Sequence, residues 1–141
     1  MNAEAFETLS IDARFNGPPD SGNGGYVCGE MAKALARRRR SEPSLLESGV
    51  RVRLMKPPPL ETDLRIDALD DGSLGLFAGD QQLAQAWADP VDFAIPKAVE
   101  IEAARRAEKK FRGFDEHVFP GCFVCGPERA VGDGLRIFPG P

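Results

Sequence analysis

The sequence predicts an α+β domain in which a curled antiparallel sheet of five or six strands surrounds one central helix. Three observations support this fold class. Apolar residues recur at helical spacing in SGNGGYVCGEMAKALARRRR, from Ser21 to Arg40. Alternating apolar and polar residues, typical of half-buried strands, occur on both sides of that helix. Turn sequences such as Asp71-Gly72 join several of these strands, which favours hairpins.

The expected helix carries an apolar stripe made of Val27, Cys28, Met31, Ala34 and Leu35. Asn23 can cap its start through the side-chain oxygen. Gly24 and Gly25 leave backbone N–H groups open at the same end. Because the N-terminus of a helix is partially positive, these groups suit a carbonyl oxygen or an anion.

Five segments alternate as strands do. The first is Leu9 to Phe15, and the others span 50–55, 62–69, 73–78 and 82–88. Pro57 to Pro59 end the second segment, because proline cannot donate to a strand ladder. Small alanines in the last segment would let a helix pack closely.

The composition changes near residue 90, so we expect a domain over 1–95 followed by a C-terminal helix and a Gly/Pro/Cys-rich tail over 96–141. The helix is expected from about Lys97 to Phe111. Glu102 and Arg106 would form a favourable pair on it. Its apolar face is thin, which predicts a place on the surface or against a partner.

Composition limits the classes of function. The chain has 141 residues, a net charge of −4 and ordinary apolar content, which argues against nucleic acid as the main partner. No apolar stretch reaches the roughly 20 residues that cross a bilayer, and the first residues lack a signal-peptide pattern. We therefore expect a cytoplasmic protein without a membrane partner. Three cysteines suggest reduced thiols.

Cys122 and Cys125 form a Cys-x-x-Cys pair near His117, which raises the question of zinc. A structural zinc site takes four ligands, and Cys28 lies on the apolar stripe, with Asp115 as a further candidate. One cysteine pair is a weak signal, so no metal and no cofactor are expected. No helix start follows to lower a thiol pKa, so packing and turn formation are preferred to a redox role.

The order of elements resembles the hotdog-fold thioesterase superfamily. The similarity rests on GNGGYVCGEMAKAL, VRVRLMKPPPLETDLRIDALDDG and QQLAQAWA, and covers about residues 9–89. The tail CFVCGPERAVGDGLRIFPGP is similar to the linker and opening strand, here Leu135 to Phe138, of a second hotdog module. The resemblance implies hydrolysis of an acyl-CoA thioester at an interface between two hotdog units, by homodimerisation or with a second module.

In this family, backbone N–H groups at the helix start hold the thioester oxygen, and a carboxylate activates water or attacks directly. The resemblance assigns the first role to Gly25 and Tyr26, beside Asn23 and Gly24. Many members carry a histidine and an acid where this chain has Asn23 and Ala32. The carboxylates left as candidates are Glu30, Asp20, Asp63 and Asp67.

Several alternatives remain open at this stage. Glu30 is either catalytic or paired with Lys33. The acyl chain is expected along the flank of Val27, Met31 and Leu35. Arg37 to Arg40 form a solvated helix end or contact the phosphates of coenzyme A. The rival functions are a non-catalytic hotdog module that binds acyl groups, or completes a partner's site, and a hydratase or dehydratase, for which His117 is the only histidine.

Overall fold

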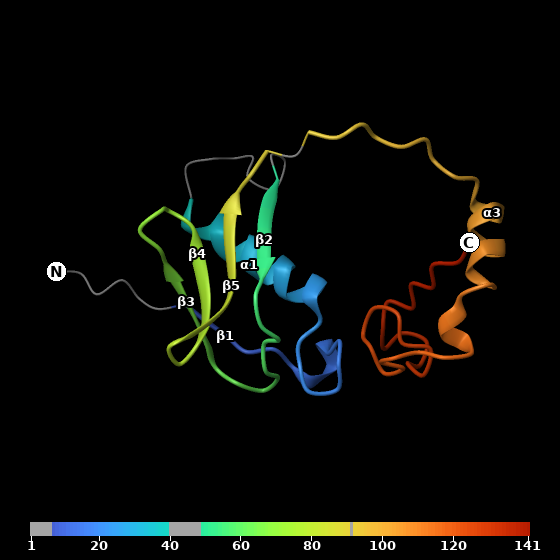
Figure 1. Cartoon of the computed structure of the whole chain (residues 1–141), viewed down its shortest axis with the longest axis horizontal. Coiled ribbons are helices and arrows are strands. Elements are labelled where there is room, and N and C mark those ends of the chain that lie inside the picture. Colours follow the sequence, from blue (N-terminus) through green and yellow to red (C-terminus); the bar gives the residue numbers. More distant parts are fainter. Residues whose placement is uncertain (1–6, 40–48, 91) are drawn as a thin grey trace.

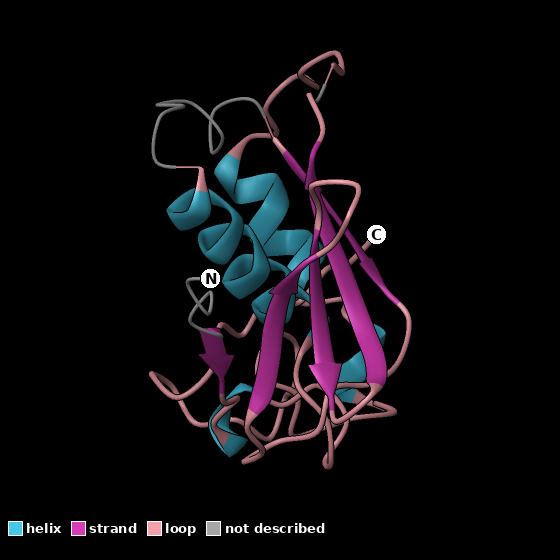
Figure 2. Cartoon of the chain, turned by 90° about the vertical axis from the view of Figure 1, so that its left-hand side faces the viewer, coloured by secondary structure: helices cyan, strands magenta, loops and turns pink. Residues whose placement is uncertain are grey.

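A five-stranded antiparallel sheet forms the body of the protein in the computed structural model, which describes residues 7–39, 49–90 and 92–141 (Figure 1). The strand order is β1-β3-β4-β5-β2. The strands are β1 (Glu7–Leu9), β2 (Val50–Leu54), β3 (Leu64–Ala68), β4 (Leu74–Ala78) and β5 (Gln81–Ala88). Helix α1 (Gly24–Arg38) lies against one face of the curled sheet (Figure 2). The expected α+β class is confirmed.

The expected hairpin at Asp71-Gly72 forms, and a second hairpin joins β4 to β5, because each turn contains a glycine with a positive φ. Gly72 has a φ of 79° between β3 and β4, and Gly79 has a φ of 56° between β4 and β5. In the first turn, the Leu69 N–H donates to the Ser73 carbonyl at 2.9 Å. These φ values are strained for residues with a side chain, so glycine fixes the two turns.

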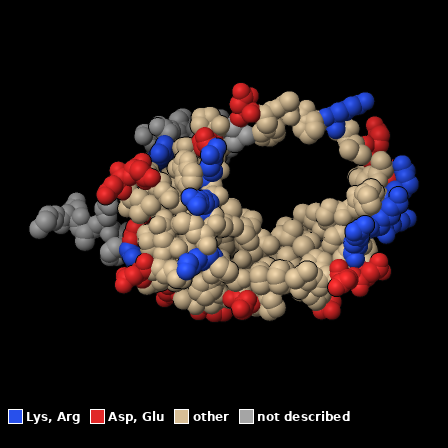
Figure 3. Space-filling view, in the orientation of Figure 1, with Lys and Arg blue, Asp and Glu red and all other residues tan. Residues whose placement is uncertain are grey.

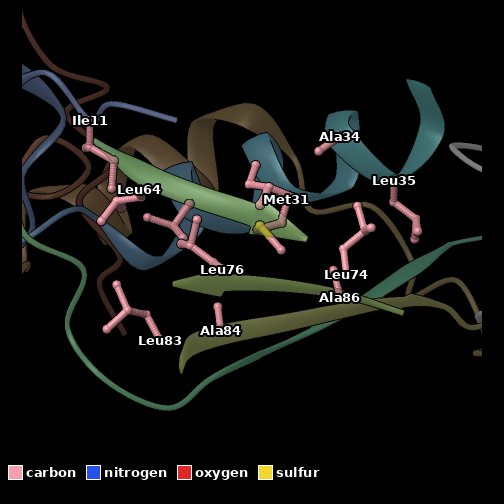
Figure 4. Close-up of a cluster of buried hydrophobic side chains, with 12 residues drawn as sticks. Ile11, Met31, Ala34, Leu35, Leu64, Leu74, Leu76, Leu83, Ala84 and Ala86 are labelled. Carbon is pink, nitrogen blue, oxygen red and sulfur yellow. The ribbon is translucent and has the colours of Figure 1, made fainter. Parts of the chain in front are cut away.

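The core lies between α1 and the sheet (Figure 4). Met31 and Leu35 of the helix are almost fully buried, as are Leu64 and Leu76 of the strands. Ala84 and Ala86 of β5 are buried as well, and their small side chains allow the helix to lie close. Full burial of one such large side chain contributes about 1.5–3 kcal/mol, which holds α1 in a fixed position.

The first expected strand, from Leu9 to Phe15, is wrong beyond Leu9. A 3₁₀ helix spans Ala13–Phe15 instead. The carboxylate of Asp12 accepts a hydrogen bond from the Arg14 N–H at 2.8 Å, which closes a turn that an extended strand could not keep. Ile11 is nevertheless completely buried, so its apolar character reflects the core and not a ladder.

Helix α1 starts at Gly24 and not at Ser21, because Asn23 caps it. The last residue of the expected helix, Arg40, lies outside the described residues. No helix in the described ranges is both long and apolar enough to span a membrane.

After β5 the chain leaves the sheet as an extended arm over residues 92–100 and reaches α3 (Ile101–Glu108) (Figure 1). This helix is shorter than expected, and Glu102 pairs with Arg105, at 2.7 Å, where a pair with Arg106 was expected. Arm, α3, tail and sheet surround an opening, with basic side chains gathered over the α3 side (Figure 3).

The tail returns to the loop that precedes α1. The Phe123 N–H donates to the Asn16 carbonyl at 2.9 Å, and the rings of Phe15 and Phe123 meet edge to face. The segment from Leu135 to Phe138 was expected to be a strand but is not one. The N–H groups of Leu135 and Ile137 nevertheless donate to the carbonyls of Phe123 and Val124. The tail therefore packs as turns against the start of the central helix.

Candidate functional site

The N-terminus of α1 is the candidate site, because it presents open backbone donors. The Asn23 side-chain oxygen accepts from the Tyr26 N–H at 3.2 Å, and the Asn23 carbonyl accepts from the Val27 N–H at 3.0 Å. Within the described residues, nothing accepts from the N–H groups of Gly24 and Gly25. Of the expected donors Gly25 and Tyr26, the Tyr26 N–H is therefore occupied by the Asn23 cap, whereas the N–H groups of Gly24 and Gly25 remain open there.

A groove of about 330 Å³ reaches this helix end. Apolar side chains form much of its wall, and Leu54 and Met55 are 42% and 40% exposed. Lys56 contributes a positive charge to the groove wall. The described residues that line the groove are Pro18, Ser21, Gly22, Gly24, Leu54, Met55, Lys56, Pro57 and Pro58.

Backbone pairing holds the two sides of the groove together. The Gly22 N–H donates to the Pro58 carbonyl at 2.8 Å, and Ser21 bridges to Pro59. Glycine fits closely here, because a Cβ atom would lie 2.9 Å from Ile11 Cδ1 and 3.2 Å from Val27 Cγ2, so that these buried side chains would have to shift. The proline run thus does more than stop β2, since its carbonyl fixes the segment that leads into α1.

Glu30 does not line this groove. Its carboxylate pairs with Lys33 Nζ at 2.7 Å, and the hydrogen bond raises the pKa of Lys33. Burial raises the pKa of Tyr26, and the nearby negative charge of Glu30 adds to that shift. Tyr26 also stacks on Phe15 with ring centroids 4.1 Å apart. Glu30 therefore belongs to a polar helix face beside the aromatic pair.

Asp20 is exposed in the turn that precedes α1 and is adjacent in sequence to the groove residue Ser21. Asp63 is exposed just before β3, and Asp67 pairs with Arg65 within that strand. The groove therefore reaches Gly24, which is next to Asn23 and Gly25 in the chain, whereas no described residue that lines it carries a carboxylate.

The expected path for the acyl chain is wrong. Val27 and Met31 are fully buried and Leu35 is 1% exposed, because this flank of α1 packs on the sheet. Near the helix start, apolar side chains are open to a ligand at Leu54 and Met55 on the groove wall. A helical pattern identifies an apolar face but cannot distinguish a core face from a ligand face.

The arginines at the end of α1 are engaged elsewhere. Arg37 pairs with Glu7, and Arg38 donates to the Ile66 carbonyl at 3.2 Å. A helix of 15 residues is about 22 Å long, so these side chains start far from the groove. Lys56 is the cation that could meet a ligand in the groove.

The tail adds a feature that the sequence analysis missed. The side-chain nitrogen of Asn23 lies 3.7 Å from Cys122 Sγ, and Cys125 Sγ lies 3.6 Å from the same sulfur. Burial opposes the Cys122 thiolate, but donors from the Cys125 and Val124 backbone, the Cys125 thiol and Asn23 lower its pKa. Burial raises the pKa of Cys28. In the sequence, the Cys-x-x-Cys spacing was the signal that could have indicated the contact between the two cysteines.

His117 is a structural residue in this arrangement. Its Nδ1 atom accepts from the Phe119 N–H at 2.9 Å, and its ring lies 5.8 Å from that of Phe111. In the part of the chain described, no three His, Cys, Asp or Glu side chains are grouped as metal ligands would be.

No protein-family model, curated protein or solved structure matches the chain. Function is therefore inferred from the groove and the two open N–H groups.

Proposed function

We propose that this protein is a hotdog-type hydrolase of acyl-CoA thioesters. One observation carries the proposal: a largely apolar groove ends at Gly24, and the N–H groups of Gly24 and of the adjacent Gly25 have no acceptor within the described residues. The curled antiparallel sheet with its packed helix is compatible with a hotdog fold.

The proposed chemistry uses the helix start as an oxyanion site. The thioester oxygen would accept from Gly24 and Gly25, and negative charge developing on it during attack by water would be stabilised there. The acyl group would lie on Leu54 and Met55. Lys56 would face the anionic coenzyme.

Asp20 is the better candidate for the base within one copy of the chain. It lies on the same segment as the groove residue Ser21. Glu30 is less suitable, because Lys33 already pairs with its carboxylate. A carboxylate from a second copy is the remaining source.

A second copy is the partner that we propose. Strand β2 lies at the outer edge of the sheet, and it carries the exposed Leu54 at its end. Unpaired edge groups favour pairing with another strand. Light scattering is expected to show a dimer, and a stable monomer would remove the shared site.

The alternative is a module that binds acyl thioesters without hydrolysing them. The observation that favours it is that none of the described residues on the groove wall is a carboxylate. The two functions differ in thiol release but share the oxygen-binding donors.

The test removes the N–H donor of Gly24, and a control variant adds a Cβ atom at the same position but keeps the donor. Asn23 has φ −61° and ψ 130°, the extended geometry that a following proline favours, so Gly24→Pro fits the backbone and deletes the N–H. Gly24→Ala keeps the N–H and is the control, since both variants place a Cβ atom against Leu54. We expect a loss of about 100-fold or more in kcat for the proline variant only.

Thiol release is measured over short, medium, long and aromatic acyl-CoA substrates, with Asp20→Ala and Glu30→Ala in parallel. Loss of turnover in Asp20→Ala identifies the base. If the wild type releases no thiol but binds a non-hydrolysable acyl-CoA in calorimetry, the binding module is correct. Neither turnover nor binding would reject both functions.

A further inference from the structure

We propose that Cys122 and Cys125 form a peroxide-reactive dithiol that closes to a disulfide beside the N-terminus of α1. Both thiols are free, and their sulfur atoms lie 3.6 Å apart. A disulfide bond is about 2.0 Å long, so closure requires an approach of only about 1.5 Å. This site is independent of the proposed hydrolysis.

The backbone around the pair forms a tight turn. The Gly126 N–H donates to the Cys122 carbonyl and the Cys122 N–H donates to the Phe119 carbonyl, both at 2.9 Å. A Cβ atom at Gly126 would lie 2.4 Å from the Pro120 carbonyl oxygen and 2.5 Å from Cys122 N. The turn therefore holds the two sulfurs together before any oxidation.

The two sulfurs differ in a way that assigns their roles. Donors from Val124, Cys125 and Asn23 lower the pKa of Cys122 despite its burial. Burial and the Cys122 sulfur raise the pKa of Cys125. Since the thiolate is the nucleophile, Cys122 reacts first and Cys125 resolves. At 5% exposure, Cys122 favours a small oxidant over a protein disulfide.

The oxidant is hydrogen peroxide or another small peroxide. The Cys122 thiolate attacks one peroxide oxygen, the O–O bond breaks, and a sulfenic acid and hydroxide form. The Cys125 sulfur then attacks Cys122 Sγ, the S–S bond forms, and the sulfenic oxygen leaves as water with the Cys125 thiol proton. The hydroxide takes up the proton that Cys122 released when it ionised. Two thiols are thus oxidised while one peroxide is reduced to two waters.

A complete zinc site does not account for this pair. Structural zinc takes four ligands, and the described residues bring no third ligand to these sulfurs. The sulfur of Cys122 is instead approached by the amide of Asn23 at 3.7 Å.

The test treats the reduced full-length chain with excess hydrogen peroxide, then counts thiols and measures the intact mass. We expect two of the three thiols to disappear, the mass to fall by two hydrogen atoms, and dithiothreitol to restore both. Peptide mapping is expected to find Cys122 joined to Cys125. Cys28→Ser is the matched control and should still lose two thiols.

Two further variants assign the order of events. Cys125→Ser is expected to stop at a Cys122 sulfenic acid that dimedone traps, and Cys122→Ser is expected to form no internal disulfide. The proposal is overturned if all three thiols survive, if Cys28 reacts first, or if the mass rises by oxygen atoms without loss of hydrogen. Bound zinc that masks the pair in the purified chain would also overturn it.

Discussion

The side-chain nitrogen of Asn23 lies 3.7 Å from Cys122 Sγ, although the two residues are 99 positions apart in the chain. The oxygen of the same amide caps α1 by accepting from the Tyr26 N–H. One side chain therefore connects the start of the central helix to the cysteine turn. Only a group with both a donor and an acceptor can make the two contacts.

Substitution of Asn23 separates these contacts. Asn23→Asp keeps an oxygen for the cap but replaces the donor to Cys122 with a negative charge, so the pKa of Cys122 is expected to rise. Asn23→Ala removes both and should cost about 1 kcal/mol of stability. Alkylation rates against pH measure the first effect and urea unfolding the second. An unchanged alkylation profile in Asn23→Asp would show that the amide does not act on the sulfur.

Arg129 ties the tail to the loop before α1. Its side chain is only 12% exposed. The groups that accept from it are the Gly121 carbonyl, the Arg14 carbonyl, the Asn16 side chain and the Asp133 carboxylate. Lysine has a single ammonium group and cannot donate to all of these acceptors. Arg129→Lys should therefore lower the free energy of unfolding, measured in urea, by about 2–3 kcal/mol. The control is Arg105→Ala, which removes the exposed ion pair with Glu102. It should change the free energy of unfolding by less than about 0.5 kcal/mol.

Helix α1 allows a stabilising change. Gly29 is exposed in its interior, and a Cβ atom there would meet nothing within 4 Å. Gly29→Ala should therefore raise the free energy of unfolding by about 0.5–1 kcal/mol. Met31→Ala on the buried face should lower it by about 2–5 kcal/mol. Equal effects at the two sites would contradict the orientation of the helix.

Asp71 should make stability depend on pH. The Ser73 hydroxyl and N–H donate to its carboxylate and lower its pKa below the ordinary value of 3.8. Because the folded pKa is the lower one, this stabilisation is complete above the ordinary pKa and is lost as pH falls through the folded pKa.

Ser73→Ala removes the first of these donors. The difference in unfolding free energy between wild type and Ser73→Ala should therefore be largest near neutral pH and should narrow in acid. A part that does not depend on pH should remain, because Gln85 also donates to the Ser73 hydroxyl at 2.8 Å. The second variant Asp71→Asn should abolish the narrowing, and a constant difference in both backgrounds would reject the assignment.

The sequence predicts elements whose cause is local. Asn23 as a cap and the glycines of the two hairpin turns follow from short-range geometry, and the structure has them as expected. The segment after Leu9 has strand-like alternation, yet the Asp12 side chain closes a turn there. Of the alternating apolar residues, Ile11 is buried but Ala13 is exposed, so alternation alone does not distinguish a strand in a ladder from a loop that covers the core.

The candidate site was predicted only in part, for a related reason. Asn23, Gly24 and Gly25 are recognisable because a helix start has its own residue preferences. The groove depends on Gly22 meeting Pro58 across 36 positions, and no periodicity encodes that contact. The role of Cys122 likewise depends on Asn23, which only the folded chain places beside it.

The return of the tail to the loop before α1 sets the order in which the protein can fold. The bond between Arg129 and the Arg14 carbonyl joins residues 115 positions apart, whereas each hairpin turn joins neighbours. Closing so long a loop costs entropy that only the finished sheet and helix can offset. We therefore expect hydrogen exchange during refolding to protect β3, β4 and β5 first. The loop before α1 and the tail that carries the cysteine pair should be protected last, as a late kinetic phase.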